Sequence, residues 1–187
     1  MNVKHGNLRM PNLKNRIELA KYFGELGFKT GAEIGVLMAR YSEILFQNIP
    51  GLKLYCVDSW RQIPHHRAVA EAAKEKLATY NAVVIHKTSM EAVKDLDDES
   101  LDFVYIDANH RYRSVRDDIT GWTKKVRKGG IVSGDDYYHL PDSKYGVVEA
   151  VDEYVKIHGY DLHTTKWDHK YPVKEDQFPN FWFMKDK

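Results

Sequence analysis

The chain has 187 residues, of which 43% are hydrophobic and 29% charged, and its formal net charge is +1. This length and composition favour one soluble domain over residues 1–187, with a helical segment at 1–28. A net charge so near zero gives no general field that would draw the chain onto nucleic acid or an anionic membrane. No apolar run reaches the ~18 residues that cross a membrane, and the N-terminus lacks the apolar centre of a secretory signal. We therefore expect a cytoplasmic protein whose ligand is a small molecule.

Hydrophobic spacing along the chain predicts alternating helices and strands. Helices are expected over residues 12–26, 38–47, 64–80, 89–95, 113–126 and 145–158, and strands over residues 31–36, 53–57, 82–86, 101–107 and 130–133. Ser89 is suited to cap the fourth helix, and Gly159 is expected to end the last one. Strands that alternate with helices need crossover connections, which predict an α/β fold: a single-domain Rossmann-like, doubly wound sheet that is mostly parallel.

The pattern changes after Gly159. Residues 160–167 and 181–185 are both strand-like and are joined by a proline-containing loop in place of a helix. Because no crossover helix separates them, we expect these two strands to pair antiparallel at the C-terminal end of the sheet.

Two of the predicted strands end in acidic residues. Asp107 ends the apolar run that begins at Leu101, and Asp135 and Asp136 follow the strand over residues 130–133. In an open parallel sheet, ligands bind at the carboxyl ends of the strands, so these carboxylates are expected to meet in one crevice. Carboxylates brought together repel each other unless a cation neutralises them, and Mg²⁺ prefers such oxygen ligands. The alternative is that Asp135 and Asp136 form an ordinary polar turn.

A second ligand signal lies at the first two strands. Gly35 closes the first strand, and Asp58, 23 residues later, ends the second, where a carboxylate can accept hydrogen bonds from ribose hydroxyls. The G-x-G-x-x-G turn of dinucleotide-binding proteins is missing, because residues 33–39 read EIGVLMA. The pair therefore suggests an adenosine ligand without a pyrophosphate.

Taken in order, these motifs resemble the class I S-adenosylmethionine-dependent methyltransferases, near the small metal-dependent O-methyltransferases related to macrocin and catechol O-methyltransferases. The resemblance is carried by residues 32–36 (AEIGV), 55–58 (YCVD), 102–110 (DFVYIDANH), 129–137 (GGIVSGDDY) and 146–153 (GVVEAVDE). One departure is Ala39, which stands where the first motif usually has glycine and is expected to narrow the cofactor loop.

The resemblance also implies roles for individual residues. For the cofactor, it places Glu33 and Gly35 beside the methionine part, Asp58 at the ribose, Thr88, Ser89 and Met90 beside adenine, and the pair Asp107 and His110 facing the sulfonium. Ser59 is a further predicted cofactor-binding residue. For catalysis, it makes Asp107, Asp135 and Asp136 the ligands of Mg²⁺ and His110 the base.

The predicted function is methyl transfer from S-adenosylmethionine to a hydroxyl of a small molecule, of the sugar or phenolic type, assisted by Mg²⁺. The ion would lower the pKa of the hydroxyl, and His110 would remove its proton. The alternatives are a nicotinamide-dependent oxidoreductase, a non-catalytic cofactor-binding module, and structural roles for the acidic residues and His110. The N-terminal helix and the aromatic C-terminus could also form a homodimer contact.

Overall fold

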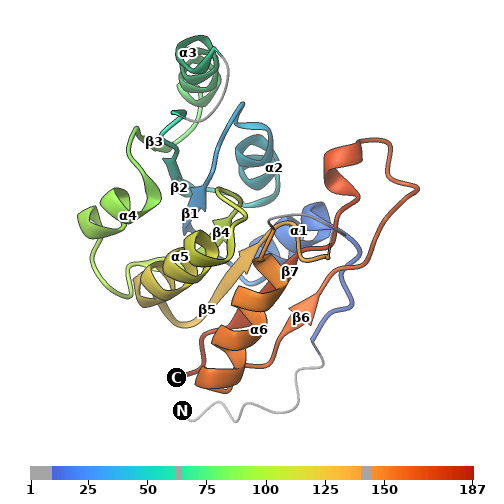
Figure 1. The fold of residues 1–187 in the computed structure, drawn as a ribbon. Helices are drawn as coiled ribbons and strands as arrows, with labels where there is room; N and C mark the ends of the chain where they lie inside the picture. The colour runs from blue at the N-terminus through green and yellow to red at the C-terminus, as the bar shows by residue number, and fades with distance from the viewer. Residues whose placement is uncertain (1–9, 62–64, 140–144) are drawn as a thin grey trace.

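The structure, a computed structural model, describes residues 10–61, 65–139 and 145–187, which form a central sheet flanked by helices (Figure 1). The strands are β1 (Thr30–Ile34), β2 (Lys53–Val57), β3 (Ala82–Ile85), β4 (Leu101–Ile106), β5 (Val126–Gly134), β6 (His163–Thr164) and β7 (Phe181–Met184). The helices are α1 (Arg16–Glu25), α2 (Arg40–Asn48), α3 (His66–Leu77), α4 (Ser89–Ala92), α5 (Tyr112–Lys125) and α6 (Val147–His158), with 3₁₀ turns η1 (Val93–Asp95) and η2 (Lys174–Asp176). No helix among these residues is long and apolar enough to cross a membrane.

The sheet has the strand order β3-β2-β1-β4-β5-β7-β6. Strands β1 to β5 are parallel, β7 is antiparallel to β5, and β6 is antiparallel to β7. The order reverses direction between β1 and β4, which creates the switch point where doubly wound sheets bind ligands. The predicted Rossmann-like sheet and its antiparallel C-terminal pair are both confirmed.

The register of the parallel strands aligns the residues that carry the expected chemistry. Ile34 at the end of β1 pairs with Val57 of β2 on one side and with Ile106 of β4 on the other. On β4, Ile106 also pairs with Gly134 of β5. The residues after these positions, which include Asp58, Asp107 and Asp135, therefore begin at one level along the sheet edge.

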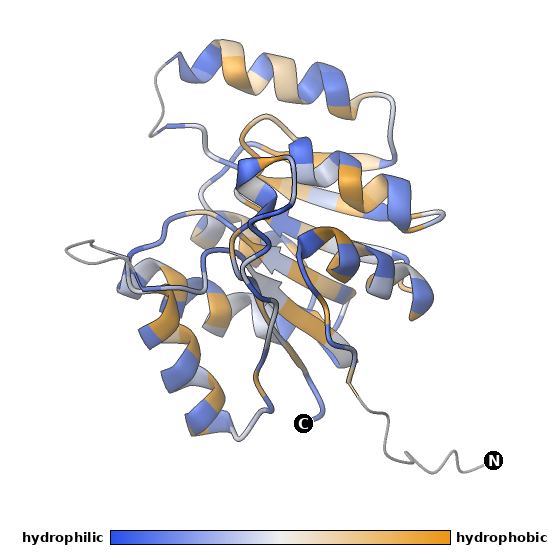
Figure 2. Ribbon diagram, turned by 90° about the vertical axis from the view of Figure 1, so that its right-hand side faces the viewer, coloured by the Kyte–Doolittle hydropathy of each residue, from blue (hydrophilic) through white to orange (hydrophobic). Residues whose placement is uncertain are grey.

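Apolar side chains on both faces of the sheet hold the helices in place. On one face, Leu19 and Phe23 of α1 pack with Phe103, and on the other, Ile119 and Trp122 of α5 pack with Val104. Strands covered on both faces need continuous apolar runs, as these have. Figure 2 shows hydrophobic segments among the central strands and helices in which hydrophilic and hydrophobic residues alternate.

Several element bounds differ from the sequence prediction, among them the helix expected over residues 89–95, which is α4 followed by the 3₁₀ turn η1. Three other differences have a clear physical reason. β5 begins at Val126, before the predicted residue 130, because the glycines at 129 and 130 lie within an irregular strand whose register against β4 shifts. The strand predicted over residues 160–167 is reduced to His163–Thr164, because pairing with β7 is limited to these two residues. The cap of α4 is Thr88, not Ser89, and the Glu91 carboxylate accepts hydrogen bonds from the Thr88 N–H and hydroxyl.

Candidate active site

One cavity of about 790 Å³ lies at the carboxyl ends of the parallel strands. It is lined by every residue that the sequence assigns to cofactor, base or metal: Glu33, Gly35, Asp58, Ser59, Thr88, Ser89, Met90, Asp107, His110, Asp135 and Asp136. The strand register explains why residues far apart in the sequence meet here. The structure thus brings the predicted residues together, while their individual roles stay predictions.

The turn after β1 depends on a glycine. Gly35 has φ +95°, and a Cβ at this position would lie 1.9 Å from the carbonyl oxygen of Asp107. The same turn contains two non-glycine residues in the left-handed region, Leu37 (φ 49°) and Ala39 (φ 56°). L-residues adopt that region at a cost, which makes this turn a strained segment beside the cavity. Ala39, predicted to narrow the turn, is fully buried there.

Asp58 holds this strained turn from the end of β2. One carboxylate oxygen accepts hydrogen bonds from the N–H groups of Val36 and Leu37, both at 2.9 Å, and the other accepts from the Trp60 N–H at 2.7 Å. The indole N–H of Trp60 in turn donates to the Leu37 carbonyl at 2.9 Å. Each carboxylate oxygen has about two acceptor sites, so Asp58 can hold the turn and still accept from a ribose. Sequence reasoning assigned it only the second task.

We expect Asp58→Asn to weaken S-adenosylhomocysteine binding by about tenfold to a hundredfold, because hydrogen bonds to a charged group contribute about 1.5–3 kcal/mol. In addition, the asparagine side chain has one oxygen and one NH₂ group, and the NH₂ group cannot accept the hydrogen bonds that backbone N–H groups donate to Asp58. Asp95→Asn is the control, since it removes a carboxylate paired with Lys87 outside the cavity. Calorimetric affinities that are equal for Asp58→Asn and Asp95→Asn would contradict this role.

The predicted adenine side contains a buried acid that sequence reasoning missed. The Trp122 indole N–H donates to the Ser89 hydroxyl at 2.8 Å, and this hydroxyl donates to the carboxylate of Asp118 on α5. Burial raises the pKa of Asp118 to about 6, although the Ser89 hydrogen bond lowers it. Asp118 lines the cavity, and only its position on the inner face of an amphipathic helix could have signalled this in the sequence.

Glu33 is an almost fully buried acid at the predicted methionine side. Its burial raises the pKa to about 8, against the opposing effect of a hydrogen bond donated by the Ser42 hydroxyl. The group is therefore largely neutral at pH 7. A cationic ligand group beside it would favour the ionised form.

His110 lies between two carboxylates at the other end of the cavity. Its Nε2 is 3.2 Å from an oxygen of Asp107, and its Nδ1 is 3.3 Å from an oxygen of Asp136. Burial lowers the pKa of His110, but the hydrogen bond to Asp107 and the charge of Asp136 outweigh it, so the pKa is raised from the ordinary value of histidine. One ligand atom from each of these three residues falls within 4.8 Å of the others, a spacing that a metal ion could bridge.

Arg16, which the sequence did not single out, enters the acidic end from α1. Its Nη1 is 3.0 Å from Asp135 and 3.8 Å from Asp107, and its Nε is 2.6 Å from Asp176. Asp176 also pairs with Arg40 at the start of α2. Since Asp176 lies 160 residues after Arg16, no local pattern in the sequence could reveal this contact.

The predicted magnesium ligands meet, but a site made of Asp107, Asp135 and Asp136 does not fit the described side chains. The two oxygens of Asp135 accept hydrogen bonds from Arg16 and from the Asp136 N–H, at 3.0 Å and 2.9 Å. Asp107 and Asp136 each face His110. A cation shared by the three carboxylates would have to displace the guanidinium.

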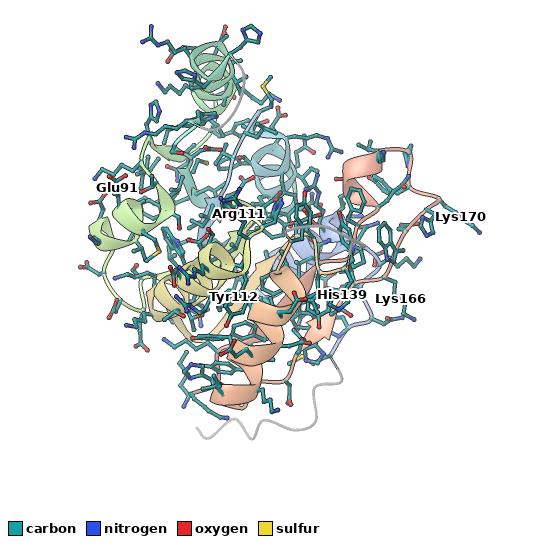
Figure 3. The ribbon with its side chains drawn as sticks, viewed as in Figure 1. Glu91, Arg111, Tyr112, His139, Lys166 and Lys170 are labelled. Atoms are coloured by element: carbon teal, nitrogen blue, oxygen red, sulfur yellow. The ribbon has the colours of Figure 1, made fainter. Side chains whose placement is uncertain are left out.

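An aromatic cluster lies beside the cavity and contributes one ring to its lining. Phe178, from the segment between β6 and β7, lines the cavity and stacks on Tyr138, with ring centres 5.2 Å apart. Trp167 contacts both rings, at 5.0 Å and 5.3 Å. In Figure 1 this segment rises beside α2, and in Figure 3 its Lys166 and Lys170 point away from the body of the molecule. This segment therefore presents one apolar ring, that of Phe178, to the cavity, and charged side chains to solvent.

The strand order, the glycine after β1 and the acidic residues after β2 and β4 define the class I methyltransferase fold. Residues 25–137 match the family model described as a methyltransferase domain. This is more than half of the chain, which belongs to that family.

Solved structures of methyltransferases share this fold. The O-methyltransferase TomG of Streptomyces achromogenes, in complex with S-adenosylmethionine, has a TM-score of 0.66 at 19% identity, covering 91% of this chain and 79% of its own. An O-methyltransferase of Bacillus cereus in complex with S-adenosylhomocysteine gives 0.67 at 14% identity, with coverages of 91% and 80%. A Clostridium thermocellum protein described as an rRNA methylase gives 0.69 at 13% identity, with coverages of 95% and 99%. At these identities the likeness shows the fold.

A sequence relative covers only part of the chain. "Uncharacterized protein y4gI" of Sinorhizobium fredii is 26% identical over 84 residues, which are 42% of this chain and 9% of that protein. The chain thus spans a small fraction of the curated relative that it matches.

Proposed function

We propose that this protein transfers a methyl group from S-adenosylmethionine to a hydroxyl oxygen of a small molecule. The observation that carries the proposal is His110, held by Asp107 in the same cavity as the cofactor motifs after β1 and β2. A base is needed at this place because a hydroxyl becomes a strong nucleophile as its proton leaves.

The hydrogen bonds of His110 suggest how it handles the proton. In the neutral ring, Nε2–H donates to Asp107, which leaves the lone pair of Nδ1 to accept the hydroxyl proton. The carboxylate of Asp136, 3.3 Å from Nδ1, then stabilises the imidazolium. The acceptor oxygen forms a bond to the methyl carbon as the bond from that carbon to sulfur breaks, and the sulfonium leaves as a neutral thioether. Alignment of these atoms is the main requirement of such a displacement.

The cofactor part of the proposal is supported by the residues around the other end of the cavity. Gly35 allows close approach at the switch point, Asp58 faces the turn, and Ser89 lies at the predicted adenine side. TomG and the Bacillus cereus protein, which share the fold, bind S-adenosylmethionine and S-adenosylhomocysteine respectively. Magnesium assistance stays a prediction of the resemblance, and no step above uses an ion.

A nucleotide acceptor is the second candidate, because the Clostridium thermocellum protein of the same fold is described as an rRNA methylase. The net charge of +1 provides little attraction for a polyanion, which favours the small molecule.

Calorimetry with S-adenosylhomocysteine tests the proposal directly. We expect one site per chain, and we expect no binding of NADH because the pyrophosphate turn is missing. Transfer of a labelled methyl group to panels of phenols, sugars and RNA then identifies the acceptor class. Failure to bind either S-adenosylmethionine or S-adenosylhomocysteine would overturn the proposal.

A further inference from the structure

The acidic end of the cavity contains a built-in cation. The Arg16 residue is 5% exposed, and its guanidinium reaches from the first turn of α1 to the ends of β4 and β5. There Nη1 lies 3.0 Å from Asp135 and 3.8 Å from Asp107, while Nε is anchored by Asp176 at 2.6 Å. The guanidinium also lies 5.1 Å from the ring centre of Tyr41. Contacts with three carboxylates and one ring fix its position.

This position is the one that an ion bridging β4 and β5 would need. Asp107 and Asp135 follow directly after paired residues of these strands, and Nη1 lies near an oxygen of each. A guanidinium is charged at any pH that a protein tolerates, and its fixed N–H groups match carboxylate oxygens. It therefore relieves the repulsion between these carboxylates in the way that a divalent cation would.

Each oxygen of Asp135 already accepts one hydrogen bond, from Arg16 and from the Asp136 N–H. A divalent cation placed between Asp107 and Asp135 would face the positive charge of the Arg16 guanidinium at close range. Asp176, which binds Arg16, is itself held in place by an ion pair with Arg40. The buried arginine is thus part of a network and not a loose surface side chain.

We infer that Arg16 supplies the positive charge between Asp107 and Asp135 in place of a divalent metal ion, so that this pair of carboxylates acts without a metal ion between them. Arg16 is a positioning residue, since it acts through Asp107, which in turn binds His110. The statement about activity rests on the proposed methyl transfer, whereas the statement about metal binding does not.

Removal of the guanidinium has a specific consequence. Arg16→Met leaves an unbranched side chain without charge, and Asp107 and Asp135 then face one space as hard oxygen ligands, while Asp176 stays paired with Arg40. Such a set suits Mg²⁺ or Mn²⁺. We expect this variant to gain a metal site that the natural chain lacks, and Arg16→Lys, which retains a charge, to gain none.

Binding of Mn²⁺, followed by the paramagnetic resonance signal of the free ion, tests the inference in the full chain. For the unsubstituted protein we expect no stoichiometric binding, no change in melting temperature with Mn²⁺ or EDTA, and the same transfer rate in EDTA as in Mg²⁺. For Arg16→Met we expect a lower melting temperature that Mn²⁺ partly restores, with Mn²⁺ affinity at least about tenfold above that of the unsubstituted chain. Arg127→Met is the matched control, because it removes an arginine paired with Asp102 away from the cavity.

Tight Mn²⁺ binding by the unsubstituted protein that Asp135→Asn abolishes would overturn the inference, as would loss of activity in EDTA. If Arg16→Met does not fold, the Mn²⁺ measurement on the unsubstituted protein and on Arg16→Lys still decides. S-adenosylhomocysteine calorimetry on the same samples separates the two proposals: absence of cofactor binding contradicts the methyltransferase function and leaves the Mn²⁺ result unchanged.

Discussion

His110→Ala is expected to lower kcat by about 10²–10⁴-fold, the range that a well-placed general base contributes. S-adenosylhomocysteine affinity should stay nearly unchanged, because the cofactor motifs contact the other end of the cavity. His158→Ala is a suitable control, since that histidine packs on Tyr154 at the end of α6 and does not line the cavity. Single-turnover methyl transfer measures the effect without interference from product release. Equal rates for the two variants would remove His110 from the reaction.

The pH dependence gives a second readout of the same residue. Burial lowers the pKa of His110, but Asp107 and Asp136 outweigh this effect and raise it from the ordinary value of histidine, and only the neutral ring accepts a proton. The rate should therefore rise with pH and level off above the raised pKa. Asp136→Asn removes a negative charge 3.3 Å from Nδ1, so it should shift this rise toward lower pH. A profile that does not move in Asp136→Asn would contradict the assigned contact.

The sheet and the site residues at the ends of its strands could be predicted from sequence, because both depend on repeated, local patterns. An apolar run that stops at Asp107 and a glycine that ends the first strand each mark a strand end. Parallel pairing then aligns such ends without further information. The predicted residues accordingly meet around one cavity.

Contacts that depend on the three-dimensional course of the chain could not be predicted. Arg16 meets Asp176 only because the segment between β6 and β7 returns beside α1 and α2. Asp118 bonds Ser89 because α5 packs against α4, and nothing in the spacing of these residues indicates it. Both missed residues are buried charged groups, whose partners are set by packing and not by sequence periodicity.

Gly35→Ala is expected to destabilise the fold by more than about 3 kcal/mol, through two additive causes: backbone strain and overpacking. At φ +95° an L-residue is strained by roughly 1–2 kcal/mol, and the new Cβ would lie 1.9 Å from the Asp107 carbonyl oxygen. Relief of that overlap requires β1 and β4 to separate at the switch point, where the Asp107 N–H donates to the Ile34 carbonyl at 2.7 Å. Cofactor affinity should fall with stability, because the same turn borders the cavity.

Gly51→Ala separates the two causes, since Gly51 has a similar positive φ of +73° but no atom within 4 Å of the place that a Cβ would take. It should cost only the conformational strain, roughly 1–2 kcal/mol, and leave S-adenosylhomocysteine binding intact. Urea unfolding of both variants gives the difference, which measures the close approach of β1 and β4. If both substitutions lower the free energy of unfolding by the same amount, the close contact between Gly35 and Asp107 is not the reason that this position needs glycine. A larger loss at Gly35 would instead show that the switch point itself demands glycine.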